Sequence, residues 1–169
     1  MNQSLFQSAW VVDDLDAAVR HWASLGVGPF FVFRKAIVEF THRSGPSATV
    51  LSYGLAQAGE MQVELVFQHD DHPSAYRDMY RTGQSGLHHV GRIVEDFEAE
   101  VEAYRRQGLV MAVEGNQGGV NYGYVDARAQ IGCMIEIVER TPGLIELYDQ
   151  VRLAGERWDG RDPFVEEAR

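Results

Sequence analysis

Two stretches of the chain, 82 residues apart, show the same switch from one hydrophobic period to another. Each begins with a strand pattern, at Leu5–Val12 and again at Leu87–Val94, and an acidic pair typical of a helix start follows. Apolar residues then recur at helical spacing, and a glycine closes each pattern where a left-handed cap fits. The equivalent pairs are Val12 and Val94, Asp14 and Asp96, Leu15 and Phe97, Ala17 and Ala99, Val19 and Val101, Trp22 and Tyr104, and Gly26 and Gly108. This repeat predicts a tandem duplication.

Three β-rich segments follow each predicted helix, separated by glycine-containing turns. The last of them echo each other: Met61–Val66 reads MQVELV and Cys133–Val138 reads CMIEIV. Each half is therefore predicted to be βαβββ, and the fold class is α+β. The predicted strands are Phe30–Thr41, Ala48–Leu55 and Met61–Phe67 in the first half, and Val110–Glu114, Val120–Asp126 and Cys133–Val138 in the second.

The predicted organisation is one domain made of two modules. Module 1 covers residues 1–68 and module 2 covers residues 87–140. Between them, residues 69–86 predict a turn and a short helix with Pro73 at its first position. Residues 141–169 predict a helix with one apolar face, followed by an extended polar tail.

Composition narrows the range of functions. The chain has 169 residues and a formal net charge of −10, which disfavours binding to nucleic acids and to anionic membranes. Its single cysteine, Cys133, excludes an internal disulfide and a cysteine-rich zinc site. No apolar stretch is long enough to cross a membrane, and no signal-peptide pattern opens the sequence, so we expect a cytoplasmic protein.

Four polar residues occupy equivalent places in the two halves. Gln7 and His89 lie in the first strand of each half, and Glu64 and Glu136 lie in the last strand between apolar neighbours. Alternation puts each glutamate on the face opposite its neighbours, so we expect the four side chains to meet on the concave side of the sheet. A glutamine oxygen, two carboxylates and an imidazole suit a divalent metal such as Zn, Ni, Co or Mn, with Fe less favoured. The alternative is that they are ordinary surface or hydrogen-bonded residues.

The two strand–helix starts, QSAWVVDDLDAA from Gln7 and GLHHVGRIVED from Gly86, together with the ligand strands QVELV and MIEIV, resemble the vicinal oxygen chelate superfamily. This superfamily includes glyoxalase I, methylmalonyl-CoA epimerase, extradiol dioxygenases and bleomycin-resistance proteins. The resemblance spans residues 5–139 and implies a curved mixed sheet around a metal site. By position, it places the metal ligands at Gln7, Glu64, His89 and Glu136. It also implies a homodimer.

The resemblance favours a metal-dependent lyase or isomerase of the glyoxalase or epimerase type. It would stabilise an enediolate of a small carbonyl or thioester substrate, with Glu136 or Glu64 as general base. The segment Ser47–Tyr53 lacks the carboxylate that related epimerases use as a second base. An extradiol-type dioxygenase and a non-catalytic ligand-binding protein are the alternatives.

Several other residues were weighed against this site. Asn121, Tyr122 and Tyr124 alternate in a predicted strand and are candidate substrate contacts. Strand alternation also predicts that His88 points to the face opposite His89. The group His69, Asp70, Asp71 and His72 looks metal-like but is interpreted as a solvated loop between the halves.

Overall fold

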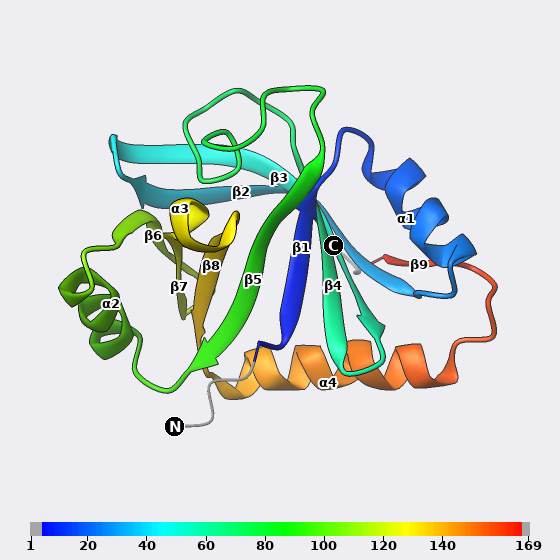
Figure 1. Cartoon of the computed structure of the whole chain (residues 1–169). Coiled ribbons are helices and arrows are strands. Elements are labelled where there is room, and N and C mark those ends of the chain that lie inside the picture. The colour runs from blue at the N-terminus through cyan, green and yellow to red at the C-terminus, as the bar shows by residue number, and fades with distance from the viewer. Residues whose placement is uncertain (1–4, 167–169) are drawn as a thin grey trace.

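The computed structural model describes residues 5–166 and shows an α+β fold (Figure 1). In module 1 the elements are β1 (Gln7–Val11), α1 (Leu15–Ser24), β2 (Phe30–His42), β3 (Gly45–Ala58) and β4 (Met61–Gln68). In module 2 they are β5 (Gly86–Val94), α2 (Phe97–Arg106), β6 (Val110–Gln117), β7 (Val120–Asp126), α3 (Arg128–Ile131) and β8 (Met134–Glu139). The chain ends with α4 (Pro142–Arg157) and β9 (Phe164–Glu166). The predicted α+β fold class is thus confirmed.

The strands form one strongly curved sheet in the order β3-β4-β1-β5-β8-β7-β6-β2-β9, and β2 also pairs with β3. The two modules join at their first strands, where β1 and β5 are antiparallel. At the far side, three residues of β2, Phe40–His42, pair with Val113–Gly115 of β6. This short pairing closes eight strands into a ring, with β9 as an addition on β2.

The helices of the two modules start in the same way. The Asp14 carboxylate accepts the Ala17 amide at the start of α1, and the Asp96 carboxylate accepts the Ala99 amide at the start of α2. These caps satisfy amides that a helix leaves unpaired, and they place a negative charge at the positive end of the helix. Both helices pack on the outside of the sheet, α1 on the right of Figure 1 and α2 on the left.

Three hydrophobic clusters stabilise the fold. Two lie between the sheet and its outer helices: α1 packs through Leu15 and Val19, and α2 through Phe97 and Val101. The third lies inside the ring of strands and includes Val38, Phe40, Leu51, Val66, Tyr76, Val113, Tyr124 and Met134. The inner cluster surrounds the space in which the candidate site lies.

Helix α4 crosses one open end of the ring, below β5, β1 and β4 in Figure 1. Its far end is fixed to module 1: a Cβ added at Gly155 would lie 3.1 Å from the Gln57 side chain on β3, and Trp158 packs against Gly28. The tail then returns along β2, where Phe30 pairs with Phe164. The predicted C-terminal helix is present, and Phe164–Glu166 of the predicted extended tail form strand β9, whose pairing with β2 was not predicted.

Two further expectations differ from the structure. The connecting segment contains turns but no helix starting at Pro73, because the Arg77 guanidinium donates to the carbonyls of Gln68 and Asp70 and holds the chain in a loop. Between β7 and β8, where the sequence suggested a plain turn, the chain forms the short helix α3. Both changes lie in connections, outside the repeated strands.

Candidate metal centre

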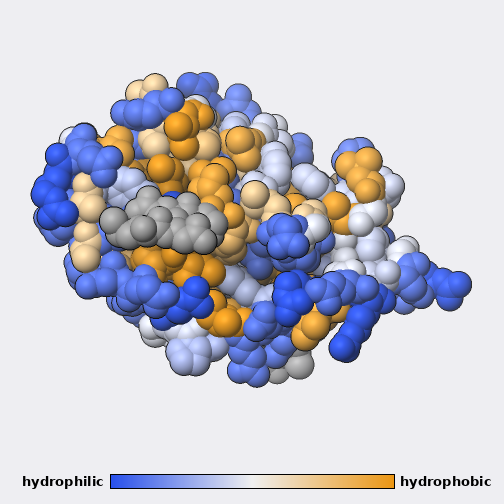
Figure 2. All heavy atoms as spheres, turned by 60° about the horizontal axis from the view of Figure 1, so that its bottom comes forward, coloured by the Kyte–Doolittle hydropathy of each residue, from blue (hydrophilic) through white to orange (hydrophobic). Residues whose placement is uncertain are grey.

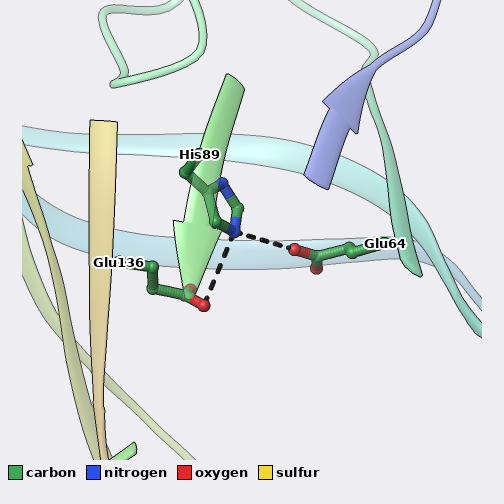
Figure 3. Close-up of side chains that lie close together, drawn as sticks. All are labelled: Glu64, His89 and Glu136. Carbon is green, nitrogen blue, oxygen red and sulfur yellow. Dashed lines mark ion pairs between the residues drawn. The ribbon is translucent and has the colours of Figure 1, made fainter. Parts of the chain in front are cut away.

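Three of the four predicted metal ligands converge inside the ring of strands (Figure 3). Glu64 comes from β4, His89 from β5 and Glu136 from β8. The His89 Nε2 atom lies 3.3 Å from Glu64 Oε2 and 3.5 Å from Glu136 Oε2. One ligand atom from each residue lies within 4.8 Å of the others. These distances let one cation contact all three side chains after small adjustments.

Strand register explains the convergence. Ala9 on β1 pairs with Glu64 on one side and with His89 on the other, so both residues lie at the same level of the sheet. Gly91 follows His89 by one two-residue repeat of β5, and it pairs with Glu136 of β8. Glu64 and Glu136 lie on equivalent strands of the two modules, β4 and β8, which flank the β1–β5 pair on its two sides. The duplication therefore brings the two carboxylates together from opposite sides of this pair.

The fourth predicted ligand, Gln7, is 1% exposed, and its Oε1 atom lies 3.4 Å from His89 Nε2. Its amide nitrogen donates to Gln62 Oε1 at 2.7 Å, and this hydrogen bond turns the amide oxygen toward the site. The strand opposite makes room for Gln7, because a Cβ at Gly91 would lie 2.9 Å from Gln7 Oε1. Gln7 is therefore positioned to offer an oxygen ligand.

The charges of the site favour a cation. Burial disfavours a charged His89, but the carboxylates of Glu136 and Glu64 outweigh it and raise the pKa of His89 to about 9. Burial also raises the pKa of Glu64, partly offset by His89. The Glu64 Oε2 atom is buried and accepts no hydrogen bond within the described structure. Two largely buried carboxylates facing one imidazole fit a divalent ion, which would replace the His89 proton.

Alternation predicted that His88 points to the face opposite His89, but in the structure it does not. Ala9 pairs with His89 while Trp10 pairs with Leu87, so His88 is the extra residue of a β-bulge. Its Nδ1 lies 2.9 Å from Nδ1 of His89, and both rings are fully buried. Burial, with the nearby His89, lowers the pKa of His88 to about 3, so His88 is neutral. The expectation failed because a bulge interrupts the two-residue period.

The site forms the floor of a cavity of about 510 Å³, which we call the central cavity. Tyr122 and Tyr124 line it, as predicted for substrate contacts, but Asn121 does not. Asn121 is the alternate residue on β7, and its amide donates to Glu139 Oε2 at 2.7 Å on the outer side of the sheet. The complete lining is Gln7, Val38, Phe40, Leu51, Tyr53, Leu55, Glu64, Ser74, Ala75, Tyr76, Val113, Gln117, Gly118, Val120, Tyr122, Tyr124, Glu136, Val138, Gly143, Leu144, Leu147 and Tyr148.

A tyrosine pair lies beside the metal centre. The hydroxyls of Tyr76 and Tyr124 are 2.8 Å apart, and both side chains are buried. Burial raises both pKa values well above the ordinary value, and the charges of Glu64 and Glu136 raise them further. Both phenols are therefore protonated, and one proton of the pair is available for an oxygen atom in the cavity.

Sequence reasoning missed three residues of the site. Tyr76 lies in the connecting loop, which has no counterpart in either repeat, and nothing in its spacing indicated a role. Tyr148 belongs to the apolar face noted on the C-terminal helix, so its burial could be predicted, but its position over the metal centre could not. Gln62 could have been found, because it lies two residues before Glu64 and alternation puts both on one face.

The connecting segment also contains the group His69, Asp70, Asp71 and His72, whose side chains do not form a common binding site. His69 Nε2 lies 2.8 Å from Ser52 Oγ, and Asp70 accepts hydrogen bonds from Thr49 and the Val50 amide. Each polar group has a partner within the loop and β3. This agrees with a structural role rather than a second metal site.

The fold and the site define a class: paired βαβββ modules that bring carboxylate, amide and imidazole groups to one centre. Residues 6–125 match the family model described as Glyoxalase/Bleomycin resistance protein/Dioxygenase superfamily. The chain belongs to this superfamily, in agreement with the resemblance found in the sequence. Glu136 and helix α4 lie beyond the matched range.

Solved structures share the fold. Methylmalonyl-CoA epimerase from Mycobacterium tuberculosis is 20% identical, with a TM-score of 0.58 over 84% of this chain and 91% of that chain. A variant of the Streptomyces coelicolor methylmalonyl-CoA epimerase in complex with 2-nitronate-propionyl-CoA is 16% identical, with a TM-score of 0.57 over 82% and 94%. A hypothetical protein from Bacillus halodurans C-125 is 15% identical, with a TM-score of 0.55 over 83% and 96%.

Two further findings concern related proteins and the lengths of the helices. No curated protein matches the chain by sequence. Among the described residues, every helix is too short or too polar to span a lipid bilayer.

Proposed function

We propose that the protein is a divalent-metal-dependent lyase or isomerase that stabilises the enediolate of a small carbonyl or thioester substrate. The observation that supports this most directly is the convergence of Glu64, His89 and Glu136 at the floor of the central cavity, which Glu64 and Glu136 line. A metal centre open to a cavity is the arrangement that metal-assisted proton transfer needs, because substrate oxygens and a base must meet at one point.

The residues that would hold the metal are Glu64, His89 and Glu136, with the Gln7 amide oxygen as fourth ligand. Without thiolates, this set suits Zn, Ni, Co or Mn. The chemistry that a bound divalent ion supplies is polarisation of the substrate carbonyl and stabilisation of negative charge on its oxygens.

The protein's own groups carry the proton transfers. A carboxylate of Glu136 or Glu64 removes the proton from the carbon next to the carbonyl, and the electron pair of that C–H bond moves toward the carbonyl oxygen. The Tyr76–Tyr124 pair donates its available proton as a hydrogen bond to an oxygen of the substrate. The same carboxylate then returns the proton to carbon, so the reaction is balanced without a further reactant.

The position of the carboxylates favours proton return from the same side. Glu64 and Glu136 are the acidic residues of the described cavity lining, and both lie at its floor. The opposite wall is built by β2 and β3 and includes Val38, Phe40 and Leu51. Inversion at one carbon needs a base on each face, whereas a shift of the proton to the neighbouring carbon needs one. We therefore favour glyoxalase-type isomerisation over epimerisation.

The test is exchange of the substrate proton with solvent. We expect the metal-loaded protein in D₂O to incorporate deuterium at the carbon next to the carbonyl of 2-oxoaldehyde–thiol adducts or acyl thioesters, measured by NMR. Glu136→Gln should lower the exchange rate by about 10²–10⁴-fold. Glu139→Gln is the matched control, since Glu139 lies on the same strand but binds Asn121 outside the cavity. Equal exchange and equal metal content in wild type and Glu136→Gln would contradict the proposal.

We also propose that the protein acts in the cytoplasm as a homodimer. The acidic composition and the superfamily resemblance support this. Light scattering of the purified chain checks the assembly, and a single species of 19.0 kDa would contradict it.

A further inference from the structure

The lining of the central cavity is mostly apolar and aromatic above its floor. Beyond Gln7, Glu64 and Glu136, most of the lining side chains are aliphatic or aromatic, and Ser74 and Gln117 are polar. The tyrosine rings at Tyr122 and Tyr124 have centroids 6.1 Å apart. Such walls bind the body of a ligand by burial of apolar area and by ring contacts. The cavity thus combines a polar floor for oxygens with an apolar upper part.

No lysine, arginine or histidine belongs to the described lining of the cavity. The exposed lining residues, which mark its opening to solvent, are Gln117, Gly118 and Gly143. Arg140, which precedes α4, donates to Glu95 at 2.7 Å, and Arg152 within α4 pairs with Asp149 and Glu156. A substrate with phosphate or carboxylate groups remote from its reacting carbon therefore finds no cationic partner at this opening, and the protein's net charge of −10 repels it.

Helix α4 limits the size of the ligand. Leu144, Leu147 and Tyr148 of α4 line the cavity, and Tyr148 packs on Phe6 with ring centroids 5.2 Å apart. Figure 2 turns the α4 side toward the viewer and shows hydrophobic side chains gathered left of centre, surrounded by hydrophilic ones. The cavity volume of about 510 Å³ lies in the range typical of small-molecule binding sites.

From these observations we infer that the substrate is a compact, uncharged molecule with an aromatic or branched apolar body and an oxygen-bearing end. Coenzyme A thioesters and glutathione adducts do not fit this description, because they carry charged groups remote from the reacting carbon. This inference rests on the proposed function, because it assigns the oxygen-bearing end of the ligand to the metal centre.

Binding of matched probes to the Zn²⁺-loaded protein tests the inference. The probes are 2-hydroxyacetophenone, which is compact and uncharged, propionyl-coenzyme A, and S-lactoylglutathione. Isothermal titration calorimetry should give a dissociation constant for 2-hydroxyacetophenone at least about tenfold below the other two. Because 2-hydroxyacetophenone is uncharged, this constant should not change between roughly 50 mM and roughly 500 mM salt.

Substitutions in α4 test whether 2-hydroxyacetophenone binds in the central cavity. Leu147→Trp fills the cavity and should weaken 2-hydroxyacetophenone binding at least about tenfold, with Zn²⁺ affinity unchanged. Leu153→Trp is the control, because Leu153 lies on the same helix, is exposed and does not line the cavity. If Leu147→Trp does not fold, Leu144→Phe makes the same test with less added volume.

Each outcome is decisive. Tighter or equal binding of propionyl-coenzyme A or S-lactoylglutathione overturns the inference, as does failure of 2-hydroxyacetophenone to bind. The proposed function fails separately, when no probe exchanges its proton with solvent. Exchange with a thioester probe alone would keep the proposed function and reject the compact, uncharged substrate.

Discussion

The two modules supply the same carboxylate but different neutral ligands, and each module orients its neutral ligand in its own way. In module 1, Gln7 is held by Gln62, two residues before the glutamate of β4. In module 2, His89 is held by His88, its own neighbour in a β-bulge. The scaffold and the carboxylate are repeated, whereas the residue that turns the neutral ligand is not.

This difference shows which parts of a duplicated site can diverge. The position of a ligand depends on strand register, which the duplication preserves. Its orientation depends on one hydrogen bond from a residue that can come from either neighbouring strand or the same strand. If His89 binds a metal through Nε2, its Nδ1 carries the proton. His88 must then accept the hydrogen bond from His89 Nδ1 through its own Nδ1.

The largest effect is expected from removing the module 2 ligand. His89→Ala takes away the imidazole between Glu64 and Glu136 and leaves two carboxylates facing each other. Metal affinity should fall by more than the roughly 10–100-fold that a supporting residue causes. Metal content after dialysis, measured by mass spectrometry, checks this, with exposed His21 replaced by alanine as control. Wild-type metal content in His89→Ala would exclude the site.

The next prediction compares the two orienting residues directly. His88→Phe keeps the ring and removes the acceptor of the His89 Nδ1 proton, and Gln62→Leu removes the partner of the Gln7 amide. We expect metal affinity to fall by about 10–100-fold for His88→Phe, and by about tenfold for Gln62→Leu. Titration with a chromophoric chelator measures both. Equal, unchanged affinities would show that orientation does not matter in either module.

Replacing Gly91 on β5 tests whether the position of the Gln7 side chain affects metal binding. Gly91→Ala places a methyl group 2.9 Å from Gln7 Oε1 and Cβ, so the amide must move. We expect up to about a tenfold loss of metal affinity and about 1–3 kcal/mol of stability. Gly143→Ala is the control, since nothing lies within 4 Å of its added Cβ. A metal affinity unchanged in Gly91→Ala would argue against Gln7 as a ligand.

The smallest effect concerns the loop that belongs to neither repeat. Asp70 is only partly buried, and although burial opposes its charge, hydrogen bonds from Thr49, Val50 and Gln68 lower its pKa to about 2. A lowered folded-state pKa stabilises the protein above the unfolded value near 3.9, and this contribution disappears as pH falls through 2.

Asp70→Asn should therefore cost about 2 kcal/mol at pH 7 and much less near pH 2. Urea unfolding at both pH values measures the difference, and Glu60→Gln at an exposed turn serves as control. A cost that does not depend on pH would assign the effect to packing instead of charge.

The repeated parts of the molecule could be predicted from the sequence, whereas of the unrepeated parts only the C-terminal helix was predicted correctly. Equivalent positions led to Gln7, Glu64, His89 and Glu136, because register is conserved when a strand is duplicated. Alternation failed at His88, where a bulge adds a residue, and an apolar helix face could be recognised without indicating what it covers. The pairing between β2 and β6 joins edges far apart in sequence, and no local pattern encodes it.

That pairing has a consequence for how the site selects its ion. Because Phe40–His42 and Val113–Gly115 join the two free edges, the modules are held on a ring of constant circumference. Selection among ions depends on the size and flexibility of the cage that holds them. A closed ring limits how far Glu64, His89 and Glu136 can move apart, so the site should favour ions whose radius matches the spacing of these ligands.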